Sequence, residues 1–465
     1  MSDIEVGFGV TCITPPLGKE IPGLFEKRYA EGIHDDLFAR AVVVDDRVTT
    51  VALAQVDCLF VRGELVESAR KFVQRVCGIP PKHCLIAATH THSGGPVYRG
   101  FASENDPEYE AFLIKQIGSA IAEAYRRRQP AAAGVATGKT DGVAFNRRFV
   151  MRDGSHQTHP GKMNPGIAHP EGPADPTVTV LGFSCPDTRQ PLGCVVNFAC
   201  HGTHMNGLLY SADYPKWIVE TLRAVYGPEF GVVFLNGACG DVTQVDNQSP
   251  RPMEFGEYWC RRTGRAVGGE AVKAVATIEA DPDTTVDTLS RRISLPIRKS
   301  PKETIKAARD YLSGKAKTFG DPVFAKELFE EEAGAEQQAK DAGPDVAAIF
   351  ARGLLNVEKL RKEKEKLRVE VQAMRIGDAL FWTAPGEIFQ AFALEAAGRS
   401  PFAHTCCVEL ANGYVGYICT PEGFAGGYES RTARSSLLAP EAGDRIVRTA
   451  LSLAGKLHDR VAETA

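Results

Sequence analysis

The feature that most constrains this chain is an apolar run that ends in two closely spaced histidines. The run is Cys84-Leu85-Ile86-Ala87-Ala88, and Thr89-His90-Thr91-His92-Ser93-Gly94-Gly95-Pro96 follows it. The apolar residues predict a buried strand, and Gly-Gly-Pro predicts that a loop follows. Side chains two residues apart in a strand point to the same side, so His90 and His92 can converge on one point. Such a pair suits zinc, although two hydrogen-bonded loop histidines would leave the same pattern.

The same arrangement occurs twice more along the chain. Residues 194–200 form an apolar run that leads into His201-Gly202-Thr203-His204. Residues 231–235 form another, which leads into Asn236-Gly237-Ala238-Cys239-Gly240-Asp241-Val242-Thr243. Glycines in such loops let a backbone approach a ligand closely. Because α/β proteins commonly bind ligands where strands end in loops, we expect one site built from these strand ends.

Length and composition limit the class of protein. At 465 residues the chain is long enough for two or three domains or for one large α/β unit. Its net charge of −4 gives no reason to expect binding to nucleic acid or to an anionic membrane. No apolar run is long enough to span a membrane, and the first residues do not resemble a signal peptide. The 12 cysteines include no Cys-x-x-Cys pair and fit a reduced, cytoplasmic protein.

Periodicity and turn residues predict alternating strands and helices. Helices are expected over residues 63–76, from Asp106-Pro107 onward, and over residues 257–280, 387–397 and 440–463, with hairpins at 41–56 and 367–382. Ser300-Pro301-Lys302-Glu303 predicts a capping box at the start of another helix. Residues 150–175 predict a long irregular loop, whose His156, His159 and His169 we interpret as polar residues near a site rather than ligands.

Residues 300–366 are charged and rich in helix-forming residues, with breaks at Gly320-Asp321-Pro322 and Gly343-Pro344. We interpret this stretch as a helical excursion from the main fold. Charge blocks such as Glu330-Glu331-Glu332 suit a solvated helical hairpin. A lid, or an arm in a homo-oligomer, would leave a similar pattern.

Three residues that follow apolar runs supply the side chains of a catalytic zinc site. They are His90, His201 and Glu387. Such sites take three or four ligands from histidine and carboxylate side chains and leave a position for water, whose pKa falls until it becomes a nucleophile. Spacing alone does not show that the three side chains converge.

Six segments, taken in order, resemble the motifs of the neutral/alkaline ceramidase family. They are Ala88-Thr89-His90-Thr91-His92-Ser93-Gly94, Phe145-Asn146-Arg147, Asn197-Phe198-Ala199-Cys200-His201-Gly202-Thr203, Gly240-Asp241-Val242-Thr243, Pro385-Gly386-Glu387 and Gly427-Tyr428-Glu429. The resemblance implies one large α/β catalytic domain over residues 1–465, with mixed β-sheets flanked by helices and the excursion near 300–366 included. The family's C-terminal immunoglobulin-like domain is expected to be absent from this short relative.

The resemblance also implies roles for individual residues. His90, His201, Glu387 and Tyr428 would bind one Zn²⁺ per chain. His92 and Arg147 would act on the substrate carbonyl and on protons, and Thr243 stands where the family has a catalytic serine. Independently of the resemblance, His204 lies three residues after His201 and is a candidate either for supporting the ligands or for replacing Tyr428 as one of them, and Asp241 is a candidate for supporting the ligands.

These features predict a zinc-dependent amidohydrolase that acts on a small molecule. Thr243 in place of serine, Gln244 in place of a common proline, and the missing secretion signal favour a cytoplasmic enzyme whose substrate is smaller or more polar than ceramide. A zinc-dependent lactonase or esterase, a metal-dependent isomerase or lyase, and a non-catalytic metal-binding protein are the alternatives. Arg147 and His92 argue against the last, because a purely structural metal site needs neither.

Overall fold

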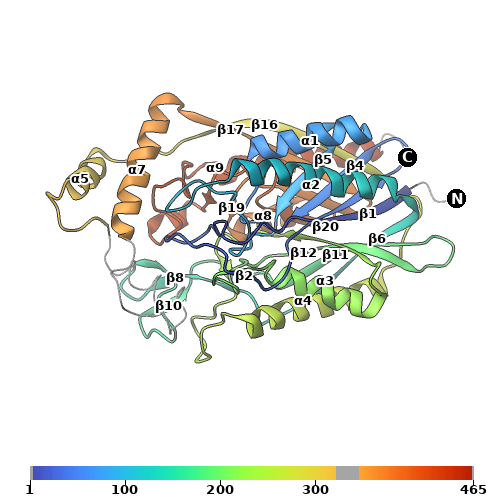
Figure 1. The fold of residues 1–465 in the computed structure, drawn as a ribbon, viewed down its shortest axis with the longest axis horizontal. Helices are drawn as coiled ribbons and strands as arrows, with labels where there is room; N and C mark the ends of the chain where they lie inside the picture. The colour runs from blue at the N-terminus through green and yellow to red at the C-terminus, as the bar shows by residue number, and fades with distance from the viewer. Residues whose placement is uncertain (1–3, 321–344, 463–465) are drawn as a thin grey trace.

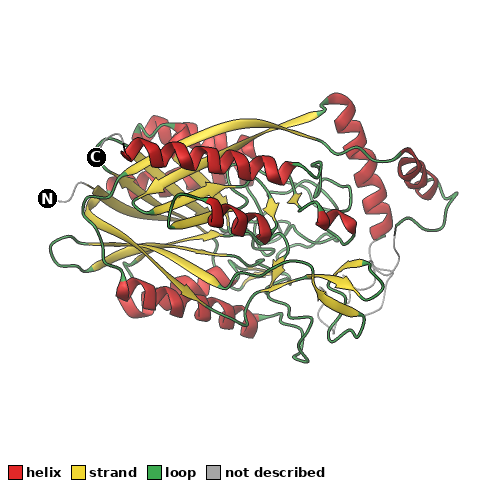
Figure 2. Ribbon diagram, turned by 180° about the vertical axis from the view of Figure 1, so that it is seen from behind, coloured by secondary structure: helices red, strands yellow, loops and turns green. Residues whose placement is uncertain are grey.

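The apolar strands assemble into two main sheets, which helices cover as predicted (Figures 1 and 2). The computed structural model describes residues 4–320 and 345–462. The larger sheet contains, in spatial order, β14 (Gly231–Asn236), β12 (Pro191–Phe198), β11 (Thr177–Ser184), β6 (Gln129–Lys139), β1 (Ile4–Cys12), β3 (Phe38–Asp45), β4 (Thr50–Val56) and β5 (Cys84–Ala88). Its pairs are antiparallel except β4 with β5 and β12 with β14.

Strand β6 joins two halves of this sheet. Its first residues, 129–131, pair with β1, and residues 132–139 pair with β11. Apolar side chains from both halves, such as Val42 and Val195, lie in one shared core. A hydrogen bond of 2.8 Å from the Phe234 N–H to Gln55 Oε1 also links β14 to β4. The loops after β5 and after β12 can therefore meet, although the strands are far apart in the sheet order.

The smaller sheet packs into the same core. It contains β16 (Val286–Pro296), β17 (Lys366–Ile376), β18 (Ala379–Thr383) and β20 (His404–Val408). Met374 and Phe381 are fully buried there against both halves of the larger sheet. Burial of apolar area on this scale is the main favourable contribution to folding.

Helices cover the outer faces of the sheets. In Figure 1, α1 (Gly63–Cys77) and α2 (Pro107–Arg126) lie above the strands, and α3 (Tyr214–Tyr226) and α4 (Glu257–Thr277) lie below them. The smaller sheet packs its outer face against α8 (Gln390–Arg399) and α9 (Ala442–Ala462). Asp106 caps α2, as predicted, by accepting the N–H groups of Glu108 and Tyr109 at 2.9 and 3.1 Å.

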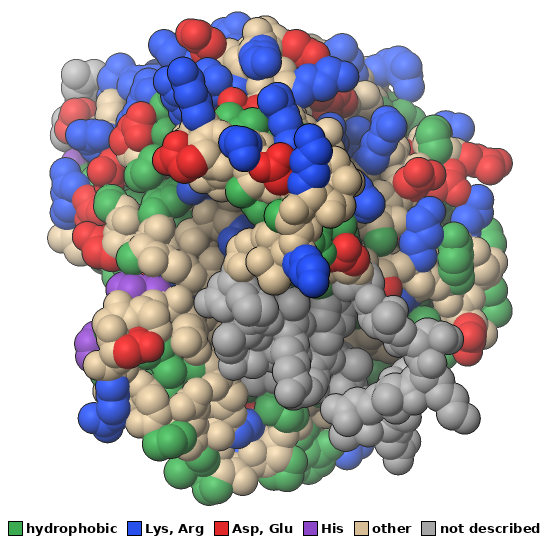
Figure 3. Space-filling view, turned by 90° about the vertical axis from the view of Figure 1, so that its left-hand side faces the viewer, with side chains coloured by type: hydrophobic (Ala, Val, Ile, Leu, Met, Phe, Trp, Pro, Cys, Tyr) green, Lys and Arg blue, Asp and Glu red, His purple; other side chains and the backbone are tan. Residues whose placement is uncertain are grey.

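The predicted helical excursion leaves the smaller sheet between β16 and β17. Its described helices are α5 (Lys302–Leu312) and α7 (Val346–Glu363), and residues 321–344, with the predicted break at Gly343, lie outside the described part. Lys, Arg, Asp and Glu side chains are interspersed over the face of the molecule at this end (Figure 3). The inner side of α7 is buried, however, because Phe350 contacts Phe25 and Phe101 in the body of the fold.

Three local predictions were wrong. Residues 150–175 are not one irregular loop, because β8 (Arg148–Met151) pairs with both β9 (His156–Thr158) and β10 (Ile167–Pro170). Ser300 does not form a capping box: its N–H donates to Glu358 Oε1 at 2.9 Å, and the N-cap of α5 is Pro301. The helix expected from residue 387 begins at residue 390, because Glu387–Ile388 forms the short strand β19 beside β21 (Tyr417–Ile418).

Two further short sheets pair segments near the site. One joins β7 (Phe145–Asn146) to β15 (Val242–Thr243), and the other joins β2 (Gly32–Ile33) to β13 (Leu209–Tyr210). All 12 cysteines are free. Within residues 4–320 and 345–462, no helix is long and apolar enough to cross a membrane.

Candidate metal centre

The loops after β5 and β12 bring His90 and His201 together. Thr91 and Gly202 form a β-bridge, and the His92 N–H donates to the Gly202 carbonyl at 2.9 Å. A Cβ on Gly202 would lie only 2.6 Å from the His90 carbonyl oxygen, so this close approach requires glycine. As a result the ring centroids of His90 and His201 are 4.5 Å apart.

Glu387 reaches the same point from β19. Its Oε2 lies 3.3 Å from His90 Nε2 and 3.4 Å from His201 Nε2. Its other oxygen accepts a 2.8 Å hydrogen bond from the Tyr414 hydroxyl. All three side chains are almost fully buried. The structure thus brings together the two histidines and the carboxylate that the sequence analysis nominated.

Backbone carbonyls orient both imidazoles with Nε2 inward. His90 Nδ1 lies 2.8 Å from the Leu59 carbonyl, and His201 Nδ1 lies 2.7 Å from the Cys239 carbonyl. Each Nδ1 must carry the proton to make these bonds, which leaves a lone pair on Nε2. His90 also has a positive φ of 69°, a conformation that is uncommon outside glycine and that clusters at functional sites.

The charges around the centre suit a cation. Burial lowers the pKa of His201 to about 3, helped by the nearby Arg147, so its imidazole is neutral at physiological pH. Burial opposes ionisation of Glu387, but the two histidines outweigh it and hold the pKa of this carboxyl well below its usual range. A neutral imidazole and an ionised carboxylate are the forms in which these side chains bind metals.

His92 completes a group of three histidines. Each can offer a ring nitrogen such that the three atoms lie within 4.8 Å of one another. Among the described residues, no hydrogen-bond partner is found for Nε2 of His90 and His201 or for either ring nitrogen of His92. Buried nitrogens without partners are costly, and a metal ion would satisfy Nε2 of His90 and His201. The residues present therefore fit a metal ion.

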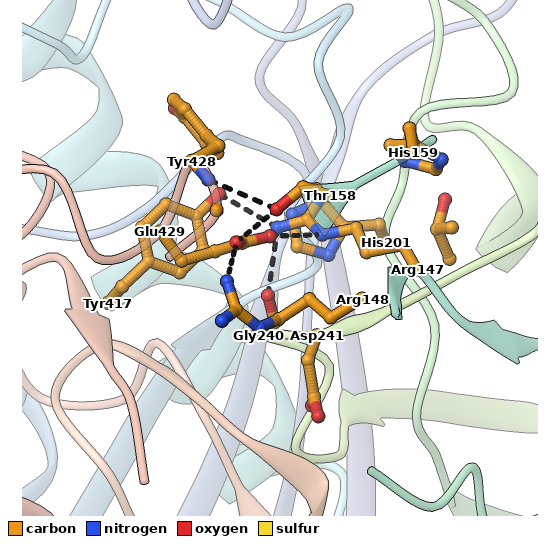
Figure 4. Close-up of polar contacts among 12 residues, drawn as sticks. Arg147, Arg148, Thr158, His159, His201, Gly240, Asp241, Tyr417, Tyr428 and Glu429 are labelled. Atoms are coloured by element: carbon orange, nitrogen blue, oxygen red, sulfur yellow. Dashed lines mark hydrogen bonds and ion pairs between the residues drawn. The ribbon is translucent and has the colours of Figure 1, made fainter. Parts of the chain in front are cut away.

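Arg147 lies near His201 and belongs to a network of ion pairs and hydrogen bonds (Figure 4). Its Nε is 2.8 Å from Glu429 Oε1, and its Nη2 donates to the Gly240 carbonyl at 2.8 Å and to the Tyr417 hydroxyl at 3.1 Å. The second oxygen of Glu429 accepts from Arg148 and Thr158. The guanidinium is consequently held in one orientation by several partners.

A cavity opens beside the centre and contains several predicted residues in its wall. Its lining comprises Gly23, Leu24, Phe25, His92, Arg147, Thr158, His159, His201, Thr203, Asn206, Thr243, Phe255, Tyr417 and Tyr428. Thr243, on β15, donates its hydroxyl to Gln244 Oε1 at 2.8 Å. Tyr428 packs its ring against Phe25 and Tyr417, at centroid distances of 5.9 and 5.5 Å.

His204 and Asp241 are both buried and hydrogen-bonded to neighbouring segments. His204 has both ring nitrogens engaged, Nδ1 with Asp213 at 2.8 Å and Nε2 with Thr263 at 3.0 Å. Asp241 accepts from the Gln390 N–H, at the start of α8, and from the Asn146 amide. Burial raises the pKa of Asp241 to about 6. Because both ring nitrogens of His204 are engaged, it is not placed to bind a metal, whereas Asp241 links the segments next to Glu387 and Arg147.

Three residues near Glu387 were not singled out from the sequence. They are Tyr414, Tyr417, which pairs with Glu387 in register between β19 and β21, and Glu409, which is fully buried. The sequence feature that could have drawn attention to all three is Asn412-Gly413, a turn-prone pair between two apolar stretches, because each of the three residues lies within a few positions of it.

Two solved structures share the fold of this chain. A solved structure described as a ceramidase complexed with C2 superposes with a TM-score of 0.74 at 20% identity, covering 99% of this chain and 76% of that one. The neutral ceramidase from Pseudomonas aeruginosa gives a TM-score of 0.72 at 18% identity, covering 99% and 75%. This chain has the neutral ceramidase fold.

The neutral ceramidase fold confirms the predicted fold class, including mixed sheets flanked by helices. Comparisons with protein-family models and with curated proteins found no match. At 18–20% identity the likeness concerns the fold, and the chemistry must be argued from the residues of this chain.

Proposed function

We propose that this protein is a zinc-dependent hydrolase that cleaves an amide (C–N) bond in a small molecule. The observation that carries the proposal is the convergence of Glu387 Oε2 on Nε2 of His90 and His201, at 3.3 and 3.4 Å. Two imidazoles and one carboxylate form a common ligand set of catalytic zinc. The similar solved structures are ceramidases, which supports an amide as the bond that is cleaved.

His90, His201 and Glu387 would hold the ion, with Tyr428 on the adjoining cavity wall as the fourth candidate. A bound zinc ion would polarise the substrate carbonyl and lower the pKa of water at the site. The remaining chemistry falls to side chains of the cavity.

Arg147 is suited to stabilise the negative charge that develops on the carbonyl oxygen. It is buried, lines the cavity, and is fixed by Glu429, Gly240 and Tyr417. A preorganised cation costs little reorganisation during the reaction, and one such donor is typically worth about 3 kcal/mol of barrier.

His92 and Thr243 are suited to proton transfer and to positioning. Both line the cavity. His92 has no hydrogen-bond partner at either nitrogen within the described residues, so it can accept a proton from the nucleophile and return it to the leaving amine. Because Thr243 donates its proton to Gln244, its oxygen remains available as an acceptor toward the cavity.

The cavity wall supports a substrate that is smaller or more polar than ceramide. On one side, two lining residues pack against Phe350 of α7. The ring centroid of Phe350 lies 5.8 Å from that of Phe25 and 6.1 Å from that of Tyr428. Elsewhere the lining is polar and includes Thr158, His159, Thr203 and Asn206. We propose a cytoplasmic enzyme, consistent with its free cysteines.

Metal content and a substrate panel test the proposal. The protein is purified without a metal-affinity tag, and zinc is measured by mass spectrometry in wild type, His201→Ala and His458→Ala. His458 is an exposed control, with 53% of its side chain accessible. We expect about one zinc per chain in wild type and in the control, with most of it lost in His201→Ala.

Zinc-loaded protein is then assayed on matched amides and lactones of increasing acyl length. Hydrolysis of short, polar amides is expected. Faster cleavage of the lactones would instead favour a lactonase or esterase. No zinc in any variant, even after zinc is supplied, would overturn the metal-dependent mechanism.

A further inference from the structure

Glu409 carries a buried carboxyl group that the proposed chemistry does not use. It follows β20 and has no accessible surface. Its Oε2 accepts from the backbone N–H groups of Cys239 and Ile388, at 3.0 and 3.1 Å. Its Oε1 accepts from the Cys239 thiol at 2.8 Å. Removing a carboxyl group from water costs free energy unless hydrogen bonds replace the lost hydration. The three hydrogen bonds to Glu409 provide this replacement, and their positions indicate what the residue does.

Both backbone donors belong to segments that position a candidate metal ligand. Cys239 is the residue whose carbonyl accepts from His201 Nδ1, and its sulfur also lies 3.4 Å from that nitrogen. Ile388 directly follows Glu387 in β19. One oxygen of Glu409 therefore binds the residue whose carbonyl orients His201 and the strand that presents Glu387.

The chain around Glu409 also contacts the segment that carries His90. The next residue, Leu410, accepts from the Ala88 N–H at the end of β5, at 3.3 Å. The Glu409 N–H donates to the Asn236 carbonyl at the end of β14, at 3.1 Å. The strand end before His90, the loop whose Cys239 carbonyl orients His201, and the strand of Glu387 thus meet at this short stretch.

The packing between two of these segments is too close to adjust freely. The Gly240 N–H donates to the Ile388 carbonyl at 3.0 Å, and a Cβ on Gly240 would lie 2.5 Å from the Glu387 carbonyl oxygen. A change in the Cys239 peptide is therefore transmitted to β19 and to Glu387.

We infer that Glu409 is a positioning residue that sets metal affinity by holding the His201 and Glu387 segments in register. The inference rests on the proposed metal site and goes beyond it, because Glu409 neither binds the metal nor touches substrate. Residues that orient metal ligands in this way typically change metal affinity by about 10- to 100-fold when they are removed.

The test compares three variants by their affinity for Zn²⁺, measured by competition with a chelating indicator. Glu409→Ala removes all three acceptor contacts. Glu409→Gln keeps an oxygen for the two N–H groups and can donate its amide to the Cys239 sulfur. Glu358→Ala is the matched control, because Glu358 carries another buried carboxyl group that accepts a backbone N–H, from Ser300 at 2.9 Å.

We expect Zn²⁺ to bind Glu409→Ala about 10- to 100-fold more weakly than wild type. Glu409→Gln and Glu358→Ala should stay within about threefold of wild type, since neither loses the backbone contacts of this cluster. The absorption spectrum of the Co²⁺-substituted protein should change in Glu409→Ala alone, since it reports ligand geometry rather than overall stability. If Glu409→Ala does not fold, Glu409→Asp replaces it, because its shorter side chain cannot reach both N–H groups.

Wild-type affinity in Glu409→Ala, or an equal loss in Glu358→Ala, would overturn the role of Glu409 and leave the proposed function intact. Failure of the wild-type protein itself to bind Zn²⁺ would overturn the proposed function, and the role of Glu409 with it.

Discussion

The phenol of Tyr414 donates a 2.8 Å hydrogen bond to Oε1 of Glu387, whose Oε2 lies within 3.4 Å of Nε2 of both His90 and His201. The ring of Tyr414 is stacked on Phe60, with centroids 3.8 Å apart, so the hydroxyl is held in place. Tyr414→Phe should preserve the stacking and remove one partner of a buried carboxylate. We expect Zn²⁺ to bind about 10-fold more weakly, a loss of about 1.4 kcal/mol, in a chelator competition assay.

Tyr226→Phe is the control for this prediction. The Tyr226 hydroxyl donates to the Val272 carbonyl at 2.9 Å, on α4 and apart from the metal centre. The prediction fails if both variants bind Zn²⁺ with the affinity of wild type.

The Glu429 carboxylate should make stability depend on pH in the acid range. Burial opposes its ionisation, but Arg148 and Arg147 outweigh this and lower its pKa to about 2. Since the unfolded pKa of glutamate is about 4.3, the stabilisation is fully present above that pH and is lost as pH falls toward 2. Urea denaturation should show that Glu429→Gln is about 3 kcal/mol less stable than wild type at pH 7, and that this difference narrows by about 2 kcal/mol at pH 3.

Glu395→Gln serves as the comparison for Glu429→Gln. Glu395 forms an ion pair with Arg399 in which both side chains are at least 40% accessible. Its loss should change stability by less than about 1 kcal/mol at both pH values. A difference for Glu429→Gln that stays constant with pH would mean that ionisation of this carboxyl is not the cause.

The contribution of the Thr243 hydroxyl to activity can be tested without changing the shape of the side chain. Thr243→Val is nearly isosteric and removes the oxygen that faces Gln244 and lines the cavity. We expect kcat/KM for the best amide of the panel to fall by about 100-fold, with Zn²⁺ content unchanged. Thr243→Ser retains the hydroxyl and should keep activity well above that of Thr243→Val, whereas equal activities would exclude a role for the hydroxyl.

The N-cap of α2 offers a stability test away from the site. Asp106 accepts two backbone N–H groups and also an ion pair from Lys19. Asp106→Ala should cost about 1 kcal/mol in urea denaturation, the usual value for loss of an N-cap. Asp106→Asn keeps the cap and loses only the partly exposed ion pair, so it should cost less than half as much. Equal losses of unfolding free energy in Asp106→Ala and Asp106→Asn would mean that the ion pair with Lys19, rather than the N-cap, provides the stabilisation.

The sequence predicted the elements whose signals are local. Continuous apolar runs identified β5, β12 and β14, and the Asp106-Pro107 pair identified the start of α2. His90, His201 and Glu387 could be nominated because each follows such a run. Their convergence could not be read from spacing, since it depends on the Thr91–Gly202 bridge and on the pairing of β19 with β21.

Two of the three wrong predictions have a tertiary cause. Ser300-Pro301-Lys302-Glu303 has the composition of a capping box, but a contact with Glu358 of α7 takes the Ser300 N–H. Residues 387–388 have no local reason to be extended, and pairing with β21 makes them so. No sequence signal indicated Glu409, because a lone glutamate after an apolar run is usually exposed. Its hydrogen-bond partners belong to two other segments of the chain.

The candidate ligands come from both main sheets, and this has a consequence for the order of folding. His90 and His201 follow strands of the larger sheet, whereas Glu387 and its partner Tyr414 belong to the segments around the smaller one. Contacts between residues so distant in the chain form slowly, because a long loop must close first. The three ligands can meet only after the two sheets have docked, so capture of the metal should be a late event of folding rather than its nucleus.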